Sequence, residues 1–296
     1  MSRISEWLQA GPLLSDGAWG TELIARGLES GTCPDVWNLS NPDAVASVAR
    51  AYVAAGSRVI LTNTFRANPV SLPADQAARA AEINAAGVRI SKEAALQAGA
   101  DHVLVFASIG PSGKMLMAGE ISESEVRSAY DIQTRALAEA GADALLIETQ
   151  SDPDEAEIIV RSAKQTGLPV IVSFTFDTGK AHDRTLTGAK PEQIAARMEA
   201  AGADAIGSNC GSGIEHFLVL CQRMRASCQL PLWMKPNAGL PVIEDGKLRY
   251  RQSSEEFAAH LPALLDAGAS FVGGCCGTSP AFIAALKERF RSCASA

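Results

Sequence analysis

The sequence predicts a (β/α)8 TIM barrel, an α/β fold in which eight parallel strands alternate with helices, and a recurring pattern indicates it. Ala-Gly, a small residue and an apolar run recur in "AAGSRVILTNTF", "QAGADHVLVFASIG", "EAGADALLIETQ", "AAGADAIGSNCG" and "DAGASFVGGCCG". A stretch with helical periodicity precedes each glycine, so the glycine is typical of a left-handed residue that ends a helix. The apolar run after it is typical of a buried parallel strand. The repeated unit is therefore helix, tight loop, strand.

Three further segments complete a set of eight strands: "PLLSDGAWG", "GLPVIVSFTF" and "QLPLWMKPNAG". We expect strands near residues 13–17, 58–65, 102–109, 143–149, 169–176, 205–210, 232–237 and 271–275. Helix starts are indicated by a capping residue before a proline, as in Asn41-Pro42, Ser151-Asp152-Pro153 and Ser279-Pro280.

Eight alternating units predict a single domain over residues 1–296, with its core at about residues 11–290. An open doubly wound sheet is the alternative. It is less favoured because such a sheet usually carries a G-x-G-x-x-G loop after its first strand, and "DGAWGTE" does not match.

Composition narrows the possible partners. The 296 residues carry a formal net charge of -7 and contain no long basic run, so neither nucleic acid nor an anionic membrane surface is an expected partner. The sequence shows no signal-peptide pattern and no run of roughly 18 apolar residues, and we expect a cytoplasmic protein without a membrane span. Seven cysteines, an odd number at irregular spacing, favour reduced thiols or metal ligands over a disulfide framework.

Three cysteines fall at the carboxyl ends of predicted strands, where barrels of this class carry their active sites. Cys210 ends the sixth strand, and Cys275 and Cys276 end the eighth. Both strands flank the seventh, so the three thiols are expected to meet at one rim. Three thiolates without a fourth protein ligand are typical of a zinc site with one open coordination position. The nearby glycines would let the backbone bend so that adjacent side chains face one ion: Gly273, Gly274 and Gly277.

Two other interpretations of these cysteines stay open. Cys275 and Cys276 could form a dithiol redox pair, and any single cysteine could be a buried small hydrophobic residue. If zinc is bound, the open position suggests a thiol substrate, because Zn²⁺ deprotonates a bound thiol and holds it as a nucleophile. The remaining cysteines are assigned no chemistry: Cys33, Cys221, Cys228 and Cys293.

Seven motifs in order resemble the homocysteine S-methyltransferases. They are "LLSDGAWGTELIARGL", "ILTNTF", "IGPSG", "LLIET", "SNCG", "PNAGLP" and "GGCCGT", and they span about residues 13 to 290. The resemblance implies a zinc-dependent barrel whose zinc (Zn2+) is held by Cys210, Cys275 and Cys276. It also implies that Asp16 and Glu148 hold the amino group of homocysteine. The remaining substrate contacts that it implies are Thr64 in the "TNTF" segment, Gly17 in "DG" and Asn209 in "NC".

The activity that this resemblance implies is methyl transfer to the thiol of homocysteine, which gives methionine. The alternatives are a redox or thiol-sensing protein that uses Cys275 and Cys276, and a non-catalytic module that presents homocysteine to a larger assembly. The four histidines (102, 182, 216 and 260) are expected to be structural or to lie at the surface. The polar loop at residues 179–190 is expected to be solvated, with contact to the donor or its carrier as the alternative.

The methyl donor is the least defined part of this expectation. Cobalamin-dependent methionine synthases carry folate and cobalamin modules in the same chain, whereas this sequence ends after the barrel and lacks a D-x-H-x-x-G signature. We therefore expect a small onium donor of the betaine or S-methylmethionine type, or a methyl-corrinoid on a separate protein. Thr149 stands where animal betaine enzymes have a tyrosine. An onium cation favours aromatic faces, for which the candidates are Trp19, Trp37, Phe65 and Trp233.

Overall fold

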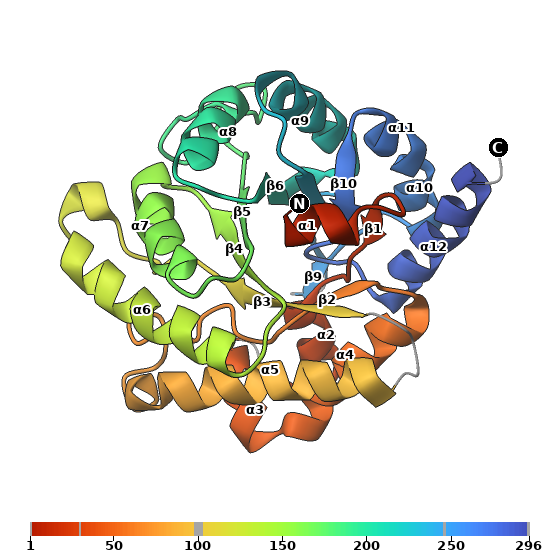
Figure 1. The fold of residues 1–296 in the computed structure, drawn as a ribbon. Helices are drawn as coiled ribbons and strands as arrows, with labels where there is room; N and C mark the ends of the chain where they lie inside the picture. Colours follow the sequence, from red (N-terminus) through yellow and green to blue (C-terminus); the bar gives the residue numbers. More distant parts are fainter. Residues whose placement is uncertain (1, 30, 98–102, 245–246, 295–296) are drawn as a thin grey trace.

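The computed structural model describes residues 2–29, 31–97, 103–244 and 247–294, and it confirms the predicted barrel (Figure 1). Eight strands, parallel at every pairing, form one sheet in the order β1-β10-β7-β6-β5-β4-β3-β2. Their bounds are β1 Leu13–Leu14, β2 Val59–Leu61, β3 Leu104–Ile109, β4 Ala144–Gln150, β5 Val170–Phe174, β6 Ala205–Gly213, β7 Leu232–Asn237 and β10 Ala269–Val272. Each predicted strand overlaps one of these, and β1 and β2 are shorter than predicted because their last residues leave the ladder to form the rim.

Strands β1 and β2 close the barrel through only a few bonds. The backbone N–H of Arg58 donates to the carbonyl of Leu14 at 2.8 Å. Closer to the carboxyl end of β2, the backbone N–H of Leu61 donates to the Asp16 carboxylate at 2.7 Å. The Asp16 side chain therefore takes the place of a strand carbonyl at the seam of the barrel.

Helices surround the sheet, and most of the recurring glycines end them as predicted. Gly56, Gly141, Gly202 and Gly268 all have positive φ, between 93° and 111°. The glycine of the second repeat lies outside the described residues. The longer helices are α4 Pro42–Ala55, α5 Ala80–Gln97, α6 Glu123–Glu139, α7 Pro153–Lys164, α8 Pro191–Ala200, α9 Ile214–Ser227 and α12 Pro280–Ala294. The shorter ones are α1 Arg3–Trp7, α2 Trp19–Ala25, α3 Trp37–Ser40, α10 Ser254–Ala259 and α11 Leu261–Asp266, with 3-10 turns η1 Pro34–Val36, η2 Ala77–Arg79 and η3 Leu116–Ala118.

The predicted helix starts agree with the structure. Asn41 and Asp152 are the N-cap residues of α4 and α7, and α12 begins at Pro280. The Asp152 side chain accepts a hydrogen bond from the backbone of Asp154, whereas the Asn41 side chain makes no capping bond. Within the described ranges, no helix is long and apolar enough to span a membrane.

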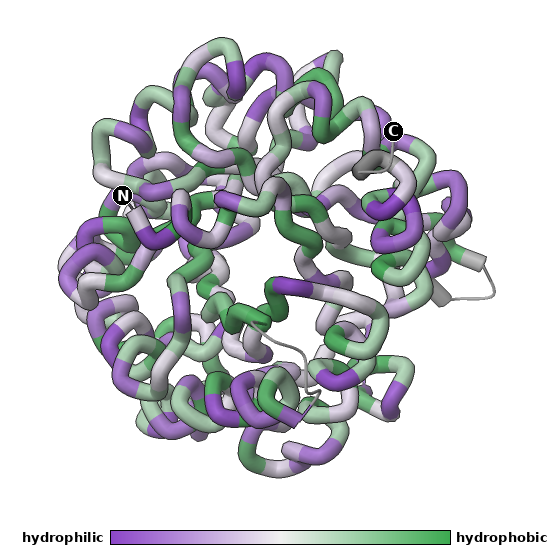
Figure 2. The backbone as a smooth tube through the Cα atoms, turned by 45° about the vertical axis from the view of Figure 1, so that its right-hand side comes forward, coloured by the Kyte–Doolittle hydropathy of each residue, from purple (hydrophilic) through white to green (hydrophobic). Residues whose placement is uncertain are grey.

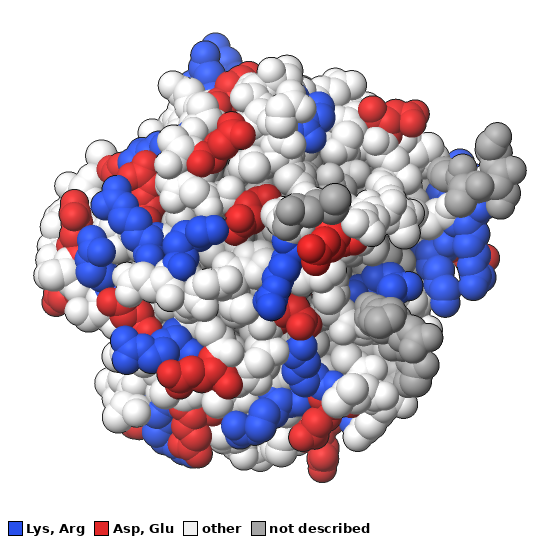
Figure 3. All heavy atoms as spheres, in the orientation of Figure 1, with Lys and Arg blue, Asp and Glu red and all other residues white. Residues whose placement is uncertain are grey.

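The amino-terminal end of the barrel is closed by an aromatic plug. Helix α1 lies across the centre of the view in Figure 1, and Trp7 at its end packs on Phe106 with ring centroids 5.4 Å apart. Trp233 and Phe271 complete the cluster. Trp233 is fully buried in this plug, so it does not lie at the rim as an aromatic wall for a donor. Figure 2 shows hydrophobic stretches around the barrel centre, and Figure 3 shows acidic and basic side chains interspersed on the plugged face.

An insertion follows β7 that the sequence pattern did not predict. Strands β8 Val242–Glu244 and β9 Lys247–Arg249 form a small antiparallel hairpin apart from the barrel sheet. After this hairpin the chain runs back to the rim of the barrel, where the ring of Tyr250 lies next to Gly277. Helix α10 begins four residues later.

Candidate metal centre and substrate pocket

Three cysteine sulfurs converge at the carboxyl-terminal rim, as predicted. Cys210 lies in β6, and Cys275 and Cys276 lie in the turn after β10. The Sγ atoms of Cys210 and Cys276 are 4.0 Å apart, and all three Sγ atoms lie within 4.8 Å of one another. Sulfurs around one tetrahedral zinc lie about 3.8 Å apart, given a Zn–S bond of about 2.3 Å. Among the described residues, this is the one set of three metal-binding side chains so closely grouped.

The backbone at Cys210 adopts a conformation that side chains rarely allow. Cys210 has a φ of 63° and Gly211 a φ of 65°, so two successive residues are left-handed. A non-glycine residue in this region is strained, and such strain concentrates at functional sites. The turn redirects the chain at the end of β6 and places the Cys210 sulfur against the segment that follows β10.

The glycines around the cysteine pair are required by close packing. A Cβ on Gly274 would lie 2.4 Å from the Thr278 hydroxyl, and a Cβ on Gly273 would lie 2.5 Å from the carbonyl oxygen of Asp16. Gly277 has a φ of 81°, and the ring of Tyr250 lies directly on it. The predicted role in bending the chain therefore applies at Gly277. Gly273 lets the turn approach the segment after β1, and Gly274 lets the turn pack on its own Thr278.

One amide side chain joins the two cysteine segments. Asn237, the last residue of β7, accepts the backbone N–H of Cys276 at Oδ1, 3.0 Å away. Its Nδ2 donates to the carbonyl of Gly211 at 2.7 Å and lies 3.7 Å from the Cys210 sulfur. Asn237 was not among the residues predicted for the site, although its place in the "PNAG" motif could have indicated it.

The electrostatics of the three thiols favour a bound cation. Hydrogen bonds from Cys275 and Cys276 lower the pKa of Cys210 to about 3. The same contacts with Cys210 raise the pKa of Cys275 well above its usual range and that of Cys276 to about 12. Crowded sulfurs thus share about one negative charge, because further thiolates would repel it. A dication would offset most of the charge of three thiolates, so the residues fit a metal ion.

Buried acidic side chains lie near the cysteines. Glu148, at the end of β4, accepts a hydrogen bond from the hydroxyl of Ser108. Burial raises the pKa of Glu148, while the Lys235 ammonium and the Ser108 hydroxyl oppose that rise. Both Asp16 and Cys210 add to the rise, which places all of these charges in one neighbourhood.

Asp16 lies in the same neighbourhood, and its carboxylate is bonded to protein groups. Its carboxylate accepts from the Trp19 indole and from the Leu61 backbone at 2.7 Å each, and from the Lys235 ammonium at 2.5 Å. Asp16 is fully buried, and Lys235 is 2% exposed. Lys235 was not among the residues predicted for the site.

Asn209 fixes the backbone next to Glu148. Its Oδ1 accepts the backbone N–H of Thr149 at 2.8 Å and the Ser173 hydroxyl at 2.7 Å. Its Nδ2 donates to the Thr149 hydroxyl at 2.7 Å and lies 3.9 Å from the Cys275 sulfur. Thr149 has a φ of 59°, so this clamp holds another strained residue at the rim.

The two remaining predicted contacts lie at the same end of the barrel. Thr64 is buried, and its hydroxyl donates to the carbonyl of Ser108 at 2.8 Å. Gly17 packs tightly: a Cβ there would lie 2.7 Å from the Tyr52 hydroxyl oxygen. These contacts pack both buried residues into the carboxyl-terminal end of the barrel.

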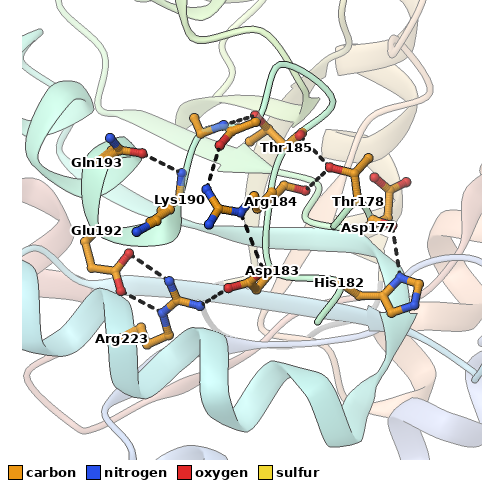
Figure 4. A network of polar contacts seen from close by, with 12 residues as sticks. Asp177, Thr178, His182, Asp183, Arg184, Thr185, Lys190, Glu192, Gln193 and Arg223 are labelled. Carbon is orange, nitrogen blue, oxygen red and sulfur yellow. Dashed lines mark hydrogen bonds and ion pairs between the residues drawn. The ribbon is translucent and has the colours of Figure 1, made fainter. Parts of the chain in front are cut away.

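The polar loop after β5 is mostly exposed, as expected, and ion pairs and hydrogen bonds hold it to its neighbours (Figure 4). Arg223 of α9 pairs with Asp183 of the loop at 2.6 Å and with Glu192 of α8 at 2.6 Å. The Thr178 hydroxyl donates to the carbonyl of Thr185 at 2.7 Å, and the His182 ring contacts the backbone oxygen of Asp177 at 3.0 Å. His102, which was expected to be structural or to lie at the surface, is outside the described residues.

Fold and site together define a parallel β/α barrel with three clustered cysteines at its rim, a set that could hold a metal ion, near buried acidic side chains. The chain belongs to the homocysteine S-methyltransferase family, whose model matches residues 13–290. It is 31% identical over 289 residues to a methionine synthase of Mycobacterium tuberculosis, covering 92% of this chain and 24% of that protein. It is 31% identical over 306 residues to the homocysteine S-methyltransferase of Escherichia coli, covering 94% of each.

Solved structures agree with this membership. The metallated form of the homocysteine methyltransferase MmuM from Escherichia coli superposes with a TM-score of 0.77 at 27% identity, covering 95% of this chain and 99% of that one. Its oxidized form gives 0.76 at 28% identity, covering 94% and 96%. A pyruvate carboxylase from Rhizobium etli, at 14% identity and a TM-score of 0.55 over 97% of this chain and 28% of that one, shares the fold alone. The chain spans about a quarter of the length of the methionine synthase that it matches.

Proposed function

We propose that this chain catalyses the zinc-dependent transfer of a methyl group to the thiol of homocysteine, which gives methionine. The observation that carries the proposal is the grouping of three cysteine sulfurs within 4.8 Å of one another, at the end of the barrel where the buried carboxylate of Glu148 also lies. A thiol and an ammonium on one small substrate match these two neighbouring features. Membership of the family and the existence of a metallated form of MmuM support the assignment.

Each part of the substrate has a partner in this arrangement. Cys210, Cys275 and Cys276 would hold the metal, which supplies the Lewis acidity that keeps a substrate thiol ionised near neutral pH. Glu148 would accept the substrate ammonium in a charge-assisted hydrogen bond. The rim around Gly17 and Thr64 would offer backbone N–H groups to the substrate carboxylate.

The reaction itself needs positioning more than acid–base catalysis. The homocysteine sulfur, having lost its proton to solvent, forms a bond to the methyl carbon as the bond between that carbon and the donor breaks. In-line displacement of this kind gains most from holding the two reactants in a fixed geometry. The clamps made by Asn209 and Asn237 serve this purpose, since they fix the segments that carry Thr149 and the cysteines.

The donor that we propose is a small onium compound, with a separate methyl-corrinoid protein as the second candidate. The ring of Tyr250 lies on Gly277, next to Cys276, and gives the rim an aromatic face that the sequence analysis did not anticipate. Burial and the nearby cysteine charges raise the pKa of the Tyr250 phenol, so the ring stays neutral and can face a cation.

Two measurements test the proposal. Metal analysis of purified protein should give about one zinc per chain, and zinc-loaded protein incubated with homocysteine should form methionine with betaine, S-methylmethionine, dimethylsulfonioacetate or methylcobalamin. Methionine from an onium donor supports our first choice, and methionine from methylcobalamin alone supports the second. A metal-free protein with a titratable Cys275–Cys276 disulfide would instead support the redox function. Zinc and homocysteine binding without turnover would support the presenting module.

A further inference from the structure

We propose that three side-chain donors, Asn209, Asn237 and Tyr250, lower the reactivity of the protein's own cysteine sulfurs, so that the methyl group goes to the substrate thiol. This inference rests on the proposed function and concerns its selectivity. A metal ion with three cysteine ligands and a substrate thiol would hold four sulfurs, and a methyl donor at the rim could react with any of them. The three donors are positioning residues, since they act through the cysteines.

Two of the donors are side-chain amides that point at different sulfurs. Asn237 Nδ2, at the end of β7, lies 3.7 Å from the sulfur of Cys210. Asn209 Nδ2, in β6, lies 3.9 Å from the sulfur of Cys275. Sulfur is a large and weak acceptor, so its hydrogen bonds are longer than those to oxygen. Each amide therefore donates to one cysteine of the cluster.

The third donor is the hydroxyl of Tyr250. Its ring lies on Gly277, and its hydroxyl makes a hydrogen bond with the sulfur of Cys276. Burial raises the pKa of Tyr250, so the hydroxyl keeps the proton that it donates. The insertion that carries the ring is anchored at both ends. The backbone N–H of Ala238 donates to the carbonyl of Cys276 at 3.0 Å, and the amide of Gln252 donates to the first turn of α9 at 2.9 Å.

Hydrogen bonds of this kind make a thiolate a weaker nucleophile. They withdraw electron density from the sulfur, and the nucleophilicity of a thiolate falls with its basicity, with a Brønsted slope of about 0.4–0.5. A substrate sulfur would bind as the fourth ligand after these donors are committed to the cysteines. It would therefore keep the most electron density of the four sulfurs and react first.

Methylation of a cysteine would damage the site. The thiolate sulfur would form a bond to the methyl carbon as the bond from that carbon to the leaving group breaks, and the bonding pair would depart with the leaving group. The cysteine would become a neutral thioether, whereas the charged thiolate is the form that binds the metal. Selectivity for the substrate sulfur therefore also preserves the metal centre.

The test uses iodomethane, a methyl donor small enough to need no binding site, on zinc-loaded protein without homocysteine. Tyr250→Phe keeps the aromatic ring and removes only the hydroxyl, and Asn209→Ala removes the amide. Tyr130→Phe, which alters a buried tyrosine of α6, is the matched control. Peptide mass spectrometry locates the added methyl group on Cys275 or Cys276. Zinc content and thermal melting show which variants are folded.

We expect Tyr250→Phe to speed methylation of Cys276 by about 3- to 10-fold and that of Cys275 by less than about 2-fold, because one hydrogen bond to one sulfur is lost. Asn209→Ala should show the reverse pattern, and Tyr130→Phe should match the unaltered protein. With Co²⁺ in place of zinc, the sulfur-to-metal charge-transfer band of Tyr250→Phe should move to lower energy, since a sulfur without its donor gives up an electron more readily.

Equal methylation of Cys276 in Tyr250→Phe and in the unaltered protein, with an unshifted cobalt band, would overturn the proposal. A parallel rise at Cys275 and Cys276 would also overturn it, because it would indicate a loosened turn. If Asn209→Ala does not fold, Tyr250→Phe decides the question by itself. Failure of the zinc-loaded protein to form methionine would instead contradict the proposed function, and it is measured separately because these assays contain no homocysteine.

Discussion

Asn237 Oδ1 accepts the backbone N–H of Cys276 at 3.0 Å, and this bond connects the last residue of β7 to one of the three clustered cysteines. The same amide donates to the carbonyl of Gly211, which follows Cys210. Both segments of the cysteine cluster are therefore held by one side chain from the strand between them. Groups of this kind orient metal ligands without touching the metal.

Replacement of Asn237 should weaken metal binding without unfolding the barrel. We expect Asn237→Ala to lower zinc affinity by about 10- to 100-fold, since the two cysteine segments would lose their shared anchor. Competition with a chromophoric chelator measures this. The control is Asn41→Ala at the start of α4, where the side chain makes no capping bond. Unchanged affinity in Asn237→Ala would show that the cysteines are placed by backbone contacts alone.

The clustered cysteines should differ sharply from the others in metal content. Cys275→Ser should lose most of its zinc, because a three-sulfur site would become a two-sulfur site. Cys228→Ala, which alters a buried cysteine at the end of α9, should retain about one zinc per chain. Atomic emission analysis of both variants tests this. Full zinc content in Cys275→Ser would place the metal elsewhere.

Two glycine substitutions should change stability in opposite directions. Gly274→Ala would place a Cβ 2.4 Å from the hydroxyl oxygen of Thr278, so it should destabilise the protein by about 1–3 kcal/mol. Gly20→Ala lies on α2 with open space around it and should stabilise by about 0.5–1 kcal/mol. Urea unfolding measures both. A neutral Gly274→Ala would mean that the turn after β10 yields to the new methyl group.

Asp35 should make stability depend on pH. Burial raises the pKa of Asp35 to about 6 from its ordinary value of 3.8. The folded state therefore favours the protonated form: its contribution is fully present below about pH 4 and is lost as the pH rises through about 6. The loss amounts to about 3 kcal/mol, at about 1.4 kcal/mol per pKa unit.

The substitution that isolates this effect is Asp35→Asn. An amide oxygen can still accept the backbone N–H of Arg66, which donates to Asp35 at 2.8 Å. Compared with the unaltered protein, Asp35→Asn should lose less stability between pH 4 and pH 7, as measured by urea unfolding at each pH. Asp43→Asn on exposed Asp43 is the control and should follow the unaltered protein. Parallel curves for Asp35→Asn and the unaltered protein would contradict the expected titration.

Much of the fold could be predicted because its determinants are local. A glycine that ends a helix and an apolar run that forms a strand repeat along the chain, and the helix starts at Asn41 and Asp152 are readable from neighbouring residues. Strand ends were less predictable, because the last residues expected in β1 lie outside the strand and form part of the rim. The hairpin before Tyr250 was missed because its short strands lack the repeated pattern.

The sequence by itself determined the barrel class and the set of metal-binding candidates, since adjacent cysteines among glycines stand out at the end of a strand. It did not determine which polar side chains satisfy one another across the barrel. Asp16 and Lys235 lie 219 positions apart, and only closure of the barrel brings their charges to 2.5 Å. The tertiary structure therefore decided that Asp16 is paired while Glu148 keeps free acceptor positions, because hydrogen-bond partners depend on where strands meet and not on local spacing.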